Sequence, residues 1–214
     1  MLTPAWTPQT SALGRAQADA AAFWAAQTLR EGRALILDLE TTGLDGAAEI
    51  VQVAVTDLDA RPLYVSLVRP SSPIPDETTA IHGITDAMVY GADPWPVVMR
   101  ELIPVLAGET VLVYNVHFDR RIITQECARH GLDPLQSMVG AWECVMHWYS
   151  MFVGEVDERR GLLRRHTLPC TPSDLPRCPH SALEDCESTA LTVRAMAMYA
   201  EVDTRLGGIK YADG

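Results

Sequence analysis

Two carboxylates stand at the end of a short apolar run, where acidic side chains are unexpected. Residues 34–37 are typical of a strand buried on both faces, and Asp38 and Glu40 follow it closely. Because side chains alternate along a strand, these two carboxylates share one face. They repel each other there, so a divalent cation such as Mg²⁺ or Mn²⁺ is their natural partner. Two solvated acids at a strand end are the alternative interpretation.

Two further acids and a histidine lie at the starts of helices. Asp119 follows the apolar strand expected at 110–114, in the first turn of a helix that Asn115 is expected to cap. The helix dipole alone would also explain an acid at this position. Asp185 shares one side of the last helix with small and apolar residues, so it is expected to point inward. His180 precedes the same helix and is a candidate general base.

The four acids come from three separate elements. In a layered α/β domain, strand ends and helix starts of this kind meet at one edge of the sheet. Carboxylates gathered there can hold two divalent ions. One ion generates hydroxide from water, and the other stabilises a leaving oxygen. The pattern therefore indicates metal-dependent hydrolysis of a phosphodiester.

Hydrophobic periodicity predicts the elements that must position these residues. Strands are expected at 34–37, 49–56, 62–68 and 110–114, with a weaker one at 138–142, and helices at 12–30, 95–107, 117–130, a stretch ending near 152, and 181–202. A hairpin turn is expected at Asp59 and Ala60. Four prolines between residues 168 and 180 disfavour regular structure there. Strands that cluster early and then alternate with helices predict an α/β domain with a mixed sheet.

Composition limits the classes of protein that remain. The 214 residues include 28 acidic and 17 basic side chains, giving a formal net charge of −11, and 48% are hydrophobic. The acidic balance argues against a protein that coats nucleic acid through bulk charge, but it does not exclude a local metal site. No apolar run has the length of a membrane span, and no secretory signal is evident. Five cysteines without a CxxC pair favour free thiols in a reducing compartment, the cytoplasm.

Four motifs, in this order, resemble those of the DEDDh 3′–5′ exonucleases, the DnaQ-like family that includes the proofreading subunit of the bacterial replicative polymerase. They are Asp38-Leu39-Glu40-Thr41-Thr42-Gly43-Leu44, Ile81-His82-Gly83-Ile84-Thr85, Tyr114-Asn115-Val116-His117-Phe118-Asp119 and His180-Ser181-Ala182-Leu183-Glu184-Asp185. The resemblance implies a ribonuclease H-like α/β fold, with a five-stranded mixed sheet flanked by α-helices. It also implies three parts: an N-terminal helical appendage at 1–32, an exonuclease domain at 33–204 and a C-terminal tail at 205–214.

The resemblance further implies roles for individual residues. Two Mg²⁺ or Mn²⁺ ions would be held by Asp38, Glu40, Asp119 and Asp185, and the attacking water would be activated by His180. The substrate-binding positions would be Thr41, Thr42, Gly43, Ile81, His82, Asn115 and Phe118. His82 has an alternative interpretation, as a loop histidine with a structural hydrogen bond.

The expected activity is hydrolysis of phosphodiester bonds at the 3′ ends of single-stranded nucleic acid, with DNA favoured, to release nucleoside monophosphates. The alternatives are an RNA-trimming exoribonuclease of the same family, a polymerase-docking module that contributes mainly by binding, and a metal phosphatase acting on small nucleotides. A DNA polymerase or repair complex is a candidate partner, and no membrane is expected. Four arginines either contact the substrate backbone or form a solvated face: Arg159, Arg160, Arg164 and Arg165.

Overall fold

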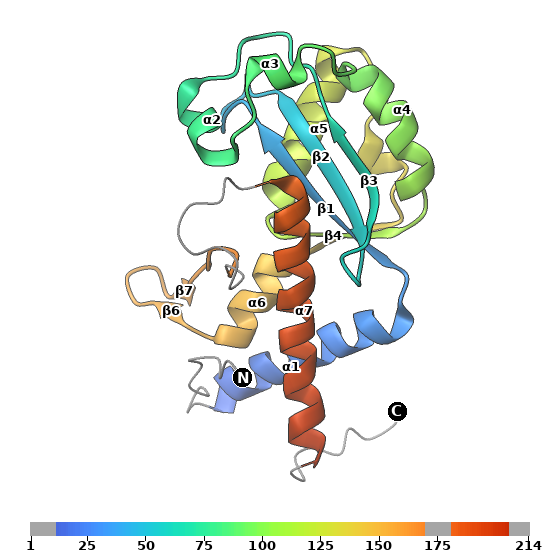
Figure 1. Ribbon diagram of the computed structural model, residues 1–214. Coiled ribbons are helices and arrows are strands. Elements are labelled where there is room, and N and C mark those ends of the chain that lie inside the picture. Colours follow the sequence, from blue (N-terminus) through green and yellow to red (C-terminus); the bar gives the residue numbers. More distant parts are fainter. Residues whose placement is uncertain (1–11, 170–180, 206–214) are drawn as a thin grey trace.

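A five-stranded mixed sheet lies at the centre of the computed structural model, which describes residues 12–169 and 181–205 (Figure 1). The strands are β1 (Ala34–Thr41), β2 (Ile50–Asp57), β3 (Pro62–Leu67), β4 (Thr110–Val113) and β5 (Ala141–Cys144), arranged in the order β3-β2-β1-β4-β5. β2 runs antiparallel to both β1 and β3, whereas β4 runs parallel to β1 and to β5. This topology confirms the predicted α/β fold with a mixed sheet of five strands.

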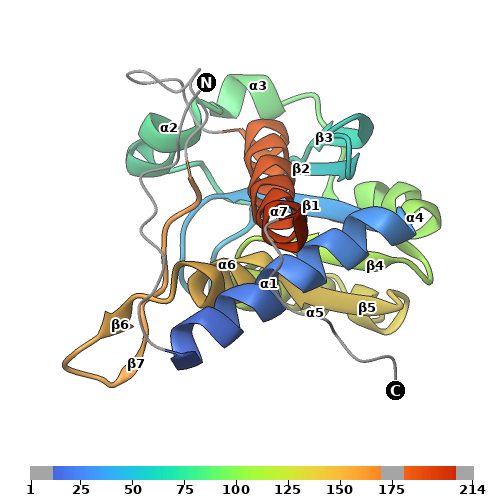
Figure 2. The ribbon, with the colours of Figure 1, turned by 90° about the horizontal axis from the view of Figure 1, so that it is seen from below.

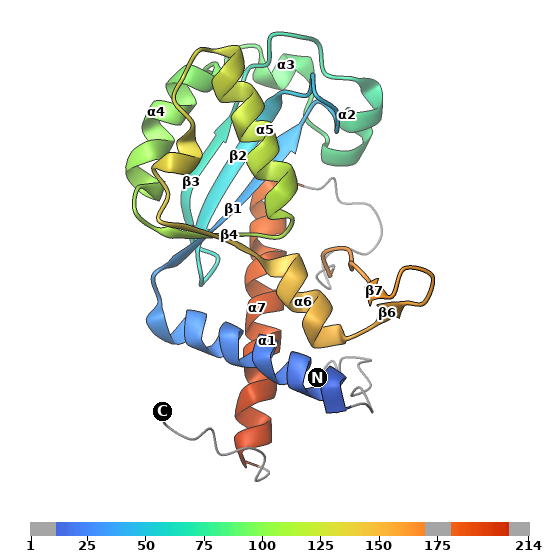
Figure 3. The ribbon, with the colours of Figure 1, turned by 180° about the vertical axis from the view of Figure 1, so that it is seen from behind.

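Helices cover both faces of the sheet. The helices of the described residues are α1 (Ala12–Glu31), α2 (Asp76–His82), α3 (Asp86–Val89), α4 (Trp95–Leu106), α5 (Val116–Arg129), α6 (Val145–Val153) and α7 (Ala182–Arg205), with a 3-10 turn η1 at Leu135–Ser137. α7 passes in front of the sheet in Figure 1, and α4 and α5 lie over the opposite face in Figure 3. Two short strands, β6 (Val156–Asp157) and β7 (Leu162–Leu163), form a separate hairpin.

Alternation along β1 divides its side chains between two cores. Leu37 packs in the cluster that includes α4 and α5, and Ile36 packs in the cluster that includes α1, α6 and α7. Both side chains are fully buried. Asp38 and Glu40 share the parity of Ile36, so the strand directs them to the face that α7 covers.

The hairpin prediction is confirmed, and the fifth strand is present but shifted toward the C-terminus relative to its predicted bounds. β2 and β3 pair across a turn in which Ala60 has a φ of 60°. The strand expected at 138–142 begins instead at Ala141, because turn η1 and an isolated bridge occupy the residues before it. Gly140 lies in that approach, and a Cβ there would be 2.4 Å from the carbonyl oxygen of Gly108.

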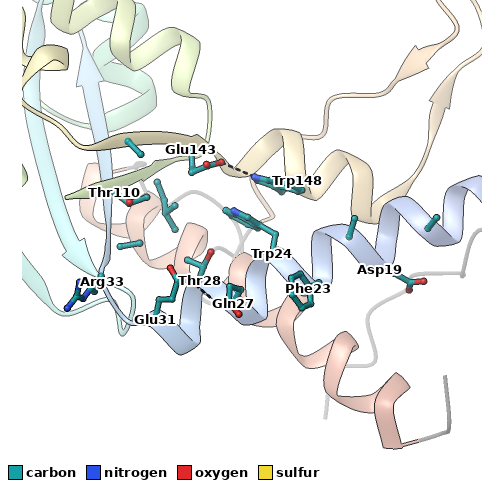
Figure 4. Close-up of a pocket in the computed structure, with 15 residues that line it drawn as sticks. Asp19, Phe23, Trp24, Gln27, Thr28, Glu31, Arg33, Thr110, Glu143 and Trp148 are labelled. Carbon is teal, nitrogen blue, oxygen red and sulfur yellow. Dashed lines mark hydrogen bonds between the residues drawn. The ribbon is translucent and has the colours of Figure 1, made fainter. Parts of the chain in front are cut away.

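Helix α1 packs outside the sheet, against α6 and α7 (Figure 2). Trp24 of α1 stacks on Trp148 of α6, with ring centroids 4.9 Å apart. A cavity of about 870 Å³ lies beside this pair, lined by α1 and by the first residues of β1, β4 and β5 (Figure 4). That end of β1 is opposite the end that carries Asp38 and Glu40. The division of the chain into appendage, domain and tail remains a prediction.

His180 and two of the five cysteines, Cys170 and Cys178, lie outside the described residues. The cysteines that the structure describes are free thiols, as expected: Cys127, Cys144 and Cys186. Across residues 12–169 and 181–205, no helix has both the length and the apolar character needed to cross a membrane.

Candidate active site

A cluster of carboxylates forms where β1 ends beside the first turns of α7. Asp38 and Glu40 come from β1, and Asp185 comes from α7. One carboxylate oxygen from each of these residues lies within 4.8 Å of the others. Glu40 is only 9% exposed, and the other two side chains are partly buried. The structure thus brings together three of the four acids that the sequence singled out.

Asp119 approaches this cluster from a third element. It lies in the first turn of α5 and is 4% exposed. Burial, together with the charge of Asp185, raises the pKa of Asp119 from 3.8 to about 7. Asp119 in turn contributes to the raised pKa values of Asp38 and Glu40. All four acids therefore share one electrostatic environment.

The predicted cap of α5 is wrong in detail. Asn115 occupies the N-cap position, but its side chain makes no capping hydrogen bond. The reason is its backbone, whose φ of −121° and ψ of 72° depart from the usual extended geometry of a cap. The carbonyl oxygen of Asn115 instead accepts a hydrogen bond of 2.9 Å from the N–H of Phe118. The Asn115 side chain is therefore not used as a cap, and its predicted role in substrate binding stays a prediction.

The electrostatics of the four acids favour bound cations. Burial first, and the neighbouring carboxylates second, raise the pKa of Asp38 well above its usual range and that of Glu40 from 4.5 to about 8. Glu40 Oε1 is fully buried and has no hydrogen-bond partner among the described residues. A buried carboxylate without a partner is unfavourable unless a cation neutralises it. This donor set, made of oxygen atoms alone, fits Mg²⁺ or Mn²⁺.

The first turn of α7 is tied to the sheet beside these acids. Gln52 of β2 stands opposite Glu40, and its Oε1 accepts a hydrogen bond of 3.0 Å from the N–H of Ala182. One turn along α7, the Cys186 thiol lies within 3.8 Å of backbone carbonyl oxygens of β1 and β2. These contacts fix the helix that carries Asp185. Sequence reasoning missed Gln52, although a single amide within the apolar run of β2 was a signal that could have identified it.

The predicted substrate-binding residues after β1 form a tight polar turn. The Thr41 hydroxyl donates to the carbonyl of Gly43 at 2.7 Å, and the Thr42 hydroxyl accepts from the N–H of Glu49 at 2.9 Å. Both threonine side chains thus make hydrogen bonds within the protein. A Cβ at Gly43 would meet nothing within 4 Å, so local packing does not require glycine there. The binding roles of these residues stay predictions.

The segment at 81–85 begins at the end of α2, where Gly83 has a φ of 73° and terminates the helix. Ile81 is 57% exposed, whereas His82 is 5% exposed. His82 Nδ1 accepts a hydrogen bond of 3.0 Å from the N–H of Ile84, and burial lowers the pKa of His82. The imidazole is therefore neutral at neutral pH, with its proton on Nε2. The structural hydrogen bond of the alternative interpretation is present, although at a helix end rather than in a loop.

Phe118 lies in the first turn of α5, partly buried against the core. The guanidinium carbon of Arg121 is 5.3 Å from the centroid of its ring. A contact between Phe118 and a nucleotide base stays a prediction. His180, the predicted general base, lies outside the described residues.

The four arginines upstream of the proline-rich segment are exposed and lie on or beside the β6–β7 hairpin: Arg159, Arg160, Arg164 and Arg165. Arg164 forms a salt bridge of 2.7 Å with Glu155. At this degree of exposure such a pair contributes little to stability. Both interpretations of these four arginines, a contact with the substrate backbone and a solvated face, stay predictions.

Comparison with known proteins matches most of the chain to nucleases. A family model described as Exonuclease matches residues 35–192. The uncharacterized exonuclease CP81 of Escherichia phage 186 is 31% identical over 169 residues, which cover 76% of this chain and 87% of the phage protein. Exodeoxyribonuclease 10 of Escherichia coli K12 is 36% identical over 159 residues, which cover 72% of this chain and 64% of that protein.

Solved structures share the fold. The nuclease domain of 3′hExo, described as a DEDDh family member bound to rAMP, matches with a TM-score of 0.58 at 18% identity, over 79% of this chain and 92% of that chain. Escherichia coli Exonuclease I in complex with a dA16 oligonucleotide matches with a TM-score of 0.57 at 18% identity, over 81% of this chain and 41% of that chain. These likenesses confirm the ribonuclease H-like fold. With the family match and the sequence identities above, they show that this chain belongs to the exonuclease family of nucleic-acid hydrolases, in its DnaQ-like DEDDh group.

Proposed function

We propose that this chain is a metal-dependent 3′–5′ exonuclease that releases nucleoside monophosphates from the 3′ ends of single-stranded nucleic acid. The observation that carries the proposal is the meeting of Asp38, Glu40 and Asp185 within 4.8 Å, with the buried Asp119 coupled to them. A phosphodiester is itself an anion, so these carboxylates repel it unless cations intervene. The same acids that oppose the bare substrate are therefore suited to phosphodiester hydrolysis once cations are bound.

The residues of the chain have distinct tasks in this proposal. Asp38, Glu40, Asp119 and Asp185 would hold two divalent cations, which supply activation of water and stabilisation of the leaving oxygen. Because these ligands stand on a strand and two helices, the protein holds them rigidly. A ring nitrogen of His180 would accept the proton of the attacking water. The water oxygen bonds to phosphorus, the bond from phosphorus to the 3′ oxygen of the penultimate nucleotide breaks, and the terminal nucleotide leaves as a 5′-monophosphate.

DNA is the favoured substrate in this proposal. Its support is the 36% identity to a protein named Exodeoxyribonuclease 10. RNA is the second candidate, because the 3′hExo nuclease domain, which shares the fold, is described bound to rAMP. The two substrates differ by the 2′-hydroxyl, which is the group a protein uses to distinguish them.

A timed digestion of oligonucleotides tests polarity, metal requirement and sugar preference together. Matched single-stranded DNA and RNA carry a label at the 5′ end, and each is incubated with Mg²⁺, with Mn²⁺ or with a chelator. We expect a descending ladder with either cation, faster on DNA, and no products with the chelator. Immediate release of the label would contradict the 3′–5′ polarity, and full activity with the chelator would contradict the metal requirement. Faster digestion of RNA would identify an exoribonuclease.

Two substitutions on α7 provide a matched pair for this assay. Asp185→Asn removes one charge from the cluster, and we expect it to abolish digestion. Glu187→Gln removes the same charge from an exposed position two residues along the helix, and we expect it to leave digestion unchanged. Full activity of Asp185→Asn would refute the metal assignment. His180→Ala is expected to lower kcat more than it raises KM.

The docking-module hypothesis predicts a different result for the same variant. A module that acted mainly by binding would tolerate Asp185→Asn in complementation of its pathway, whereas a nuclease would not. Association with a polymerase remains a prediction. The net charge of −11 makes long-range attraction to nucleic acid weak, so we expect low processivity on long strands.

A further inference from the structure

The loop between β1 and β2 lacks an apolar anchor of its own at its tip. It contains Thr42 and Gly43, predicted to bind substrate, and residues 44–47 are exposed. Even the one large apolar side chain of this stretch, Leu44, is 79% exposed. Burial of side chains therefore does not hold the tip of this loop. Its conformation depends on hydrogen bonds to its backbone.

Two of those hydrogen bonds lie within the segment itself, from the Thr41 hydroxyl to the Gly43 carbonyl and from the Ala47 N–H to Asp45 Oδ1, and four more come from one face of α5. Arg121 Nη2 donates to the carbonyl of Leu44 at 2.9 Å, and Arg121 Nη1 donates to the carbonyl of Asp45 at 3.1 Å. Gln125 Nε2 donates to the same Asp45 carbonyl at 3.2 Å. Arg129 Nη2 donates to the carbonyl of Ala47 at 2.9 Å. The three donors are spaced four residues apart, so they form a single row along the helix.

Arg121 is held in place by two neighbours on α5, Phe118 and Gln125. Its guanidinium stacks over the ring of Phe118, with the carbon 5.3 Å from the ring centroid, and Arg121 Nη1 donates to Gln125 Oε1 at 2.6 Å. A planar fork fixed in this way can hold two neighbouring carbonyl oxygens at once. Asp119 is two residues before Arg121 on the same helix. The orientation of the loop is thus set relative to an acid of the candidate site.

We propose that Arg121 is a positioning residue, which holds the loop at 42–47 against α5 and so sets the place of Thr42 and Gly43 relative to Asp119 when a 3′ end binds. This inference rests on the proposed exonuclease function. Arg121 acts through the loop, so its loss weakens binding of the strand and leaves the chemistry at the carboxylates nearly intact.

Steady-state kinetics on a single-stranded oligonucleotide test the inference. We expect Arg121→Ala to raise KM about tenfold, the effect typical of losing a charged hydrogen-bond donor, with kcat changed less than twofold. Arg121→Lys keeps the charge but loses the fork, so it should give an intermediate KM. The matched control is Arg120→Ala, because Arg120 is exposed, is adjacent on α5, and lies over Trp142 rather than the loop. An equal rise of KM in Arg120→Ala, or none in Arg121→Ala, would overturn the inference.

Direct contact of Arg121 with a phosphate would produce a different signature. It would flatten the salt dependence of KM in Arg121→Ala, because one fewer counterion would be released on binding. We expect the slope to stay that of wild type, and a flattened slope would refute the positioning role.

Amide hydrogen exchange of residues 42–47 separates this inference from the proposed function, because it needs no activity. Faster exchange in Arg121→Ala, but not in Arg120→Ala, supports the restraint of the loop even for a chain that digests no oligonucleotide. Unchanged exchange in both variants would refute the restraint whether or not the chain is active.

Discussion

Replacing Glu40 by glutamine should stabilise the protein when no divalent cation is bound, although it removes a proposed ligand. Glu40 is 9% exposed, and burial together with the neighbouring acids raises its pKa from 4.5 to about 8. The folded state therefore holds this proton more tightly than the unfolded state does. For that reason the contribution of Glu40 to the free energy of unfolding is fully present below pH 4.5 and is lost as the pH rises through about 8, where Glu40 ionises in the folded protein.

The size of this penalty follows from the pKa shift. One pKa unit corresponds to about 1.4 kcal/mol, so a Glu40 pKa of about 8 implies a loss on the order of 3 kcal/mol at neutral pH. The loss approaches about 5 kcal/mol above pH 8. Glutamine carries no charge at any pH, so the Glu40→Gln variant does not undergo this loss of stability. In a chain of this size about 1 kcal/mol changes Tm by 2–4 °C, so the variant should melt roughly 10–20 °C higher than wild type at pH 8.

Thermal unfolding in a chelator at pH 5 and at pH 8 measures this difference. We expect Glu40→Gln to exceed wild type at pH 8 and to approach it at pH 5. Adding Mg²⁺ should raise the Tm of wild type more than that of the variant, because the variant has lost one carboxylate ligand. Glu187→Gln, on the exposed side of α7, should match wild type under all conditions. A variant that is no more stable than wild type at pH 8, or whose advantage does not depend on pH, would refute the electrostatic reasoning.

Three further substitutions address the fold and the placement of the helices. Gly140→Ala should lower the free energy of unfolding by about 1–3 kcal/mol in urea titrations, because the new Cβ would meet the backbone of Gly108 at 2.4 Å. Trp148→Ala should cost about 1–2 kcal/mol in the same titration through the loss of its stack on Trp24, and an unchanged midpoint would show that the pair contributes nothing. Gln52→Ala should lower kcat more than it changes KM, because the first N–H of α7 loses its acceptor on β2; an effect on KM alone would contradict this role.

The sequence contained enough information to predict most of the sheet and the direction of its acids. Side-chain alternation determines which face a strand residue occupies, so the placement of Asp38 and Glu40 on the face of Ile36 needed only the pattern of β1. In the same way, the 3.6-residue period placed Asp185 on the buried side of α7. The bounds of the short strand β5 were predicted incorrectly because its few residues carry a weak period, and packing of the preceding turn decided where it begins.

The acid cluster was predictable because the direction of each acidic side chain follows from its position in its own strand or helix. What only the tertiary structure decided are contacts between residues distant along the chain: Gln52 with the start of α7, and Arg121 with the loop after β1. The apolar run around Gln52 marks it as an unusual residue, but no local pattern identifies the partner of a glutamine or an arginine. Asn115 shows the converse, since its residue type favours a cap and its backbone torsions prevent one. Local sequence therefore determines which acidic side chains the site contains. The placement of α7 and of the loop after β1 depends on long-range contacts whose partners no local pattern identifies.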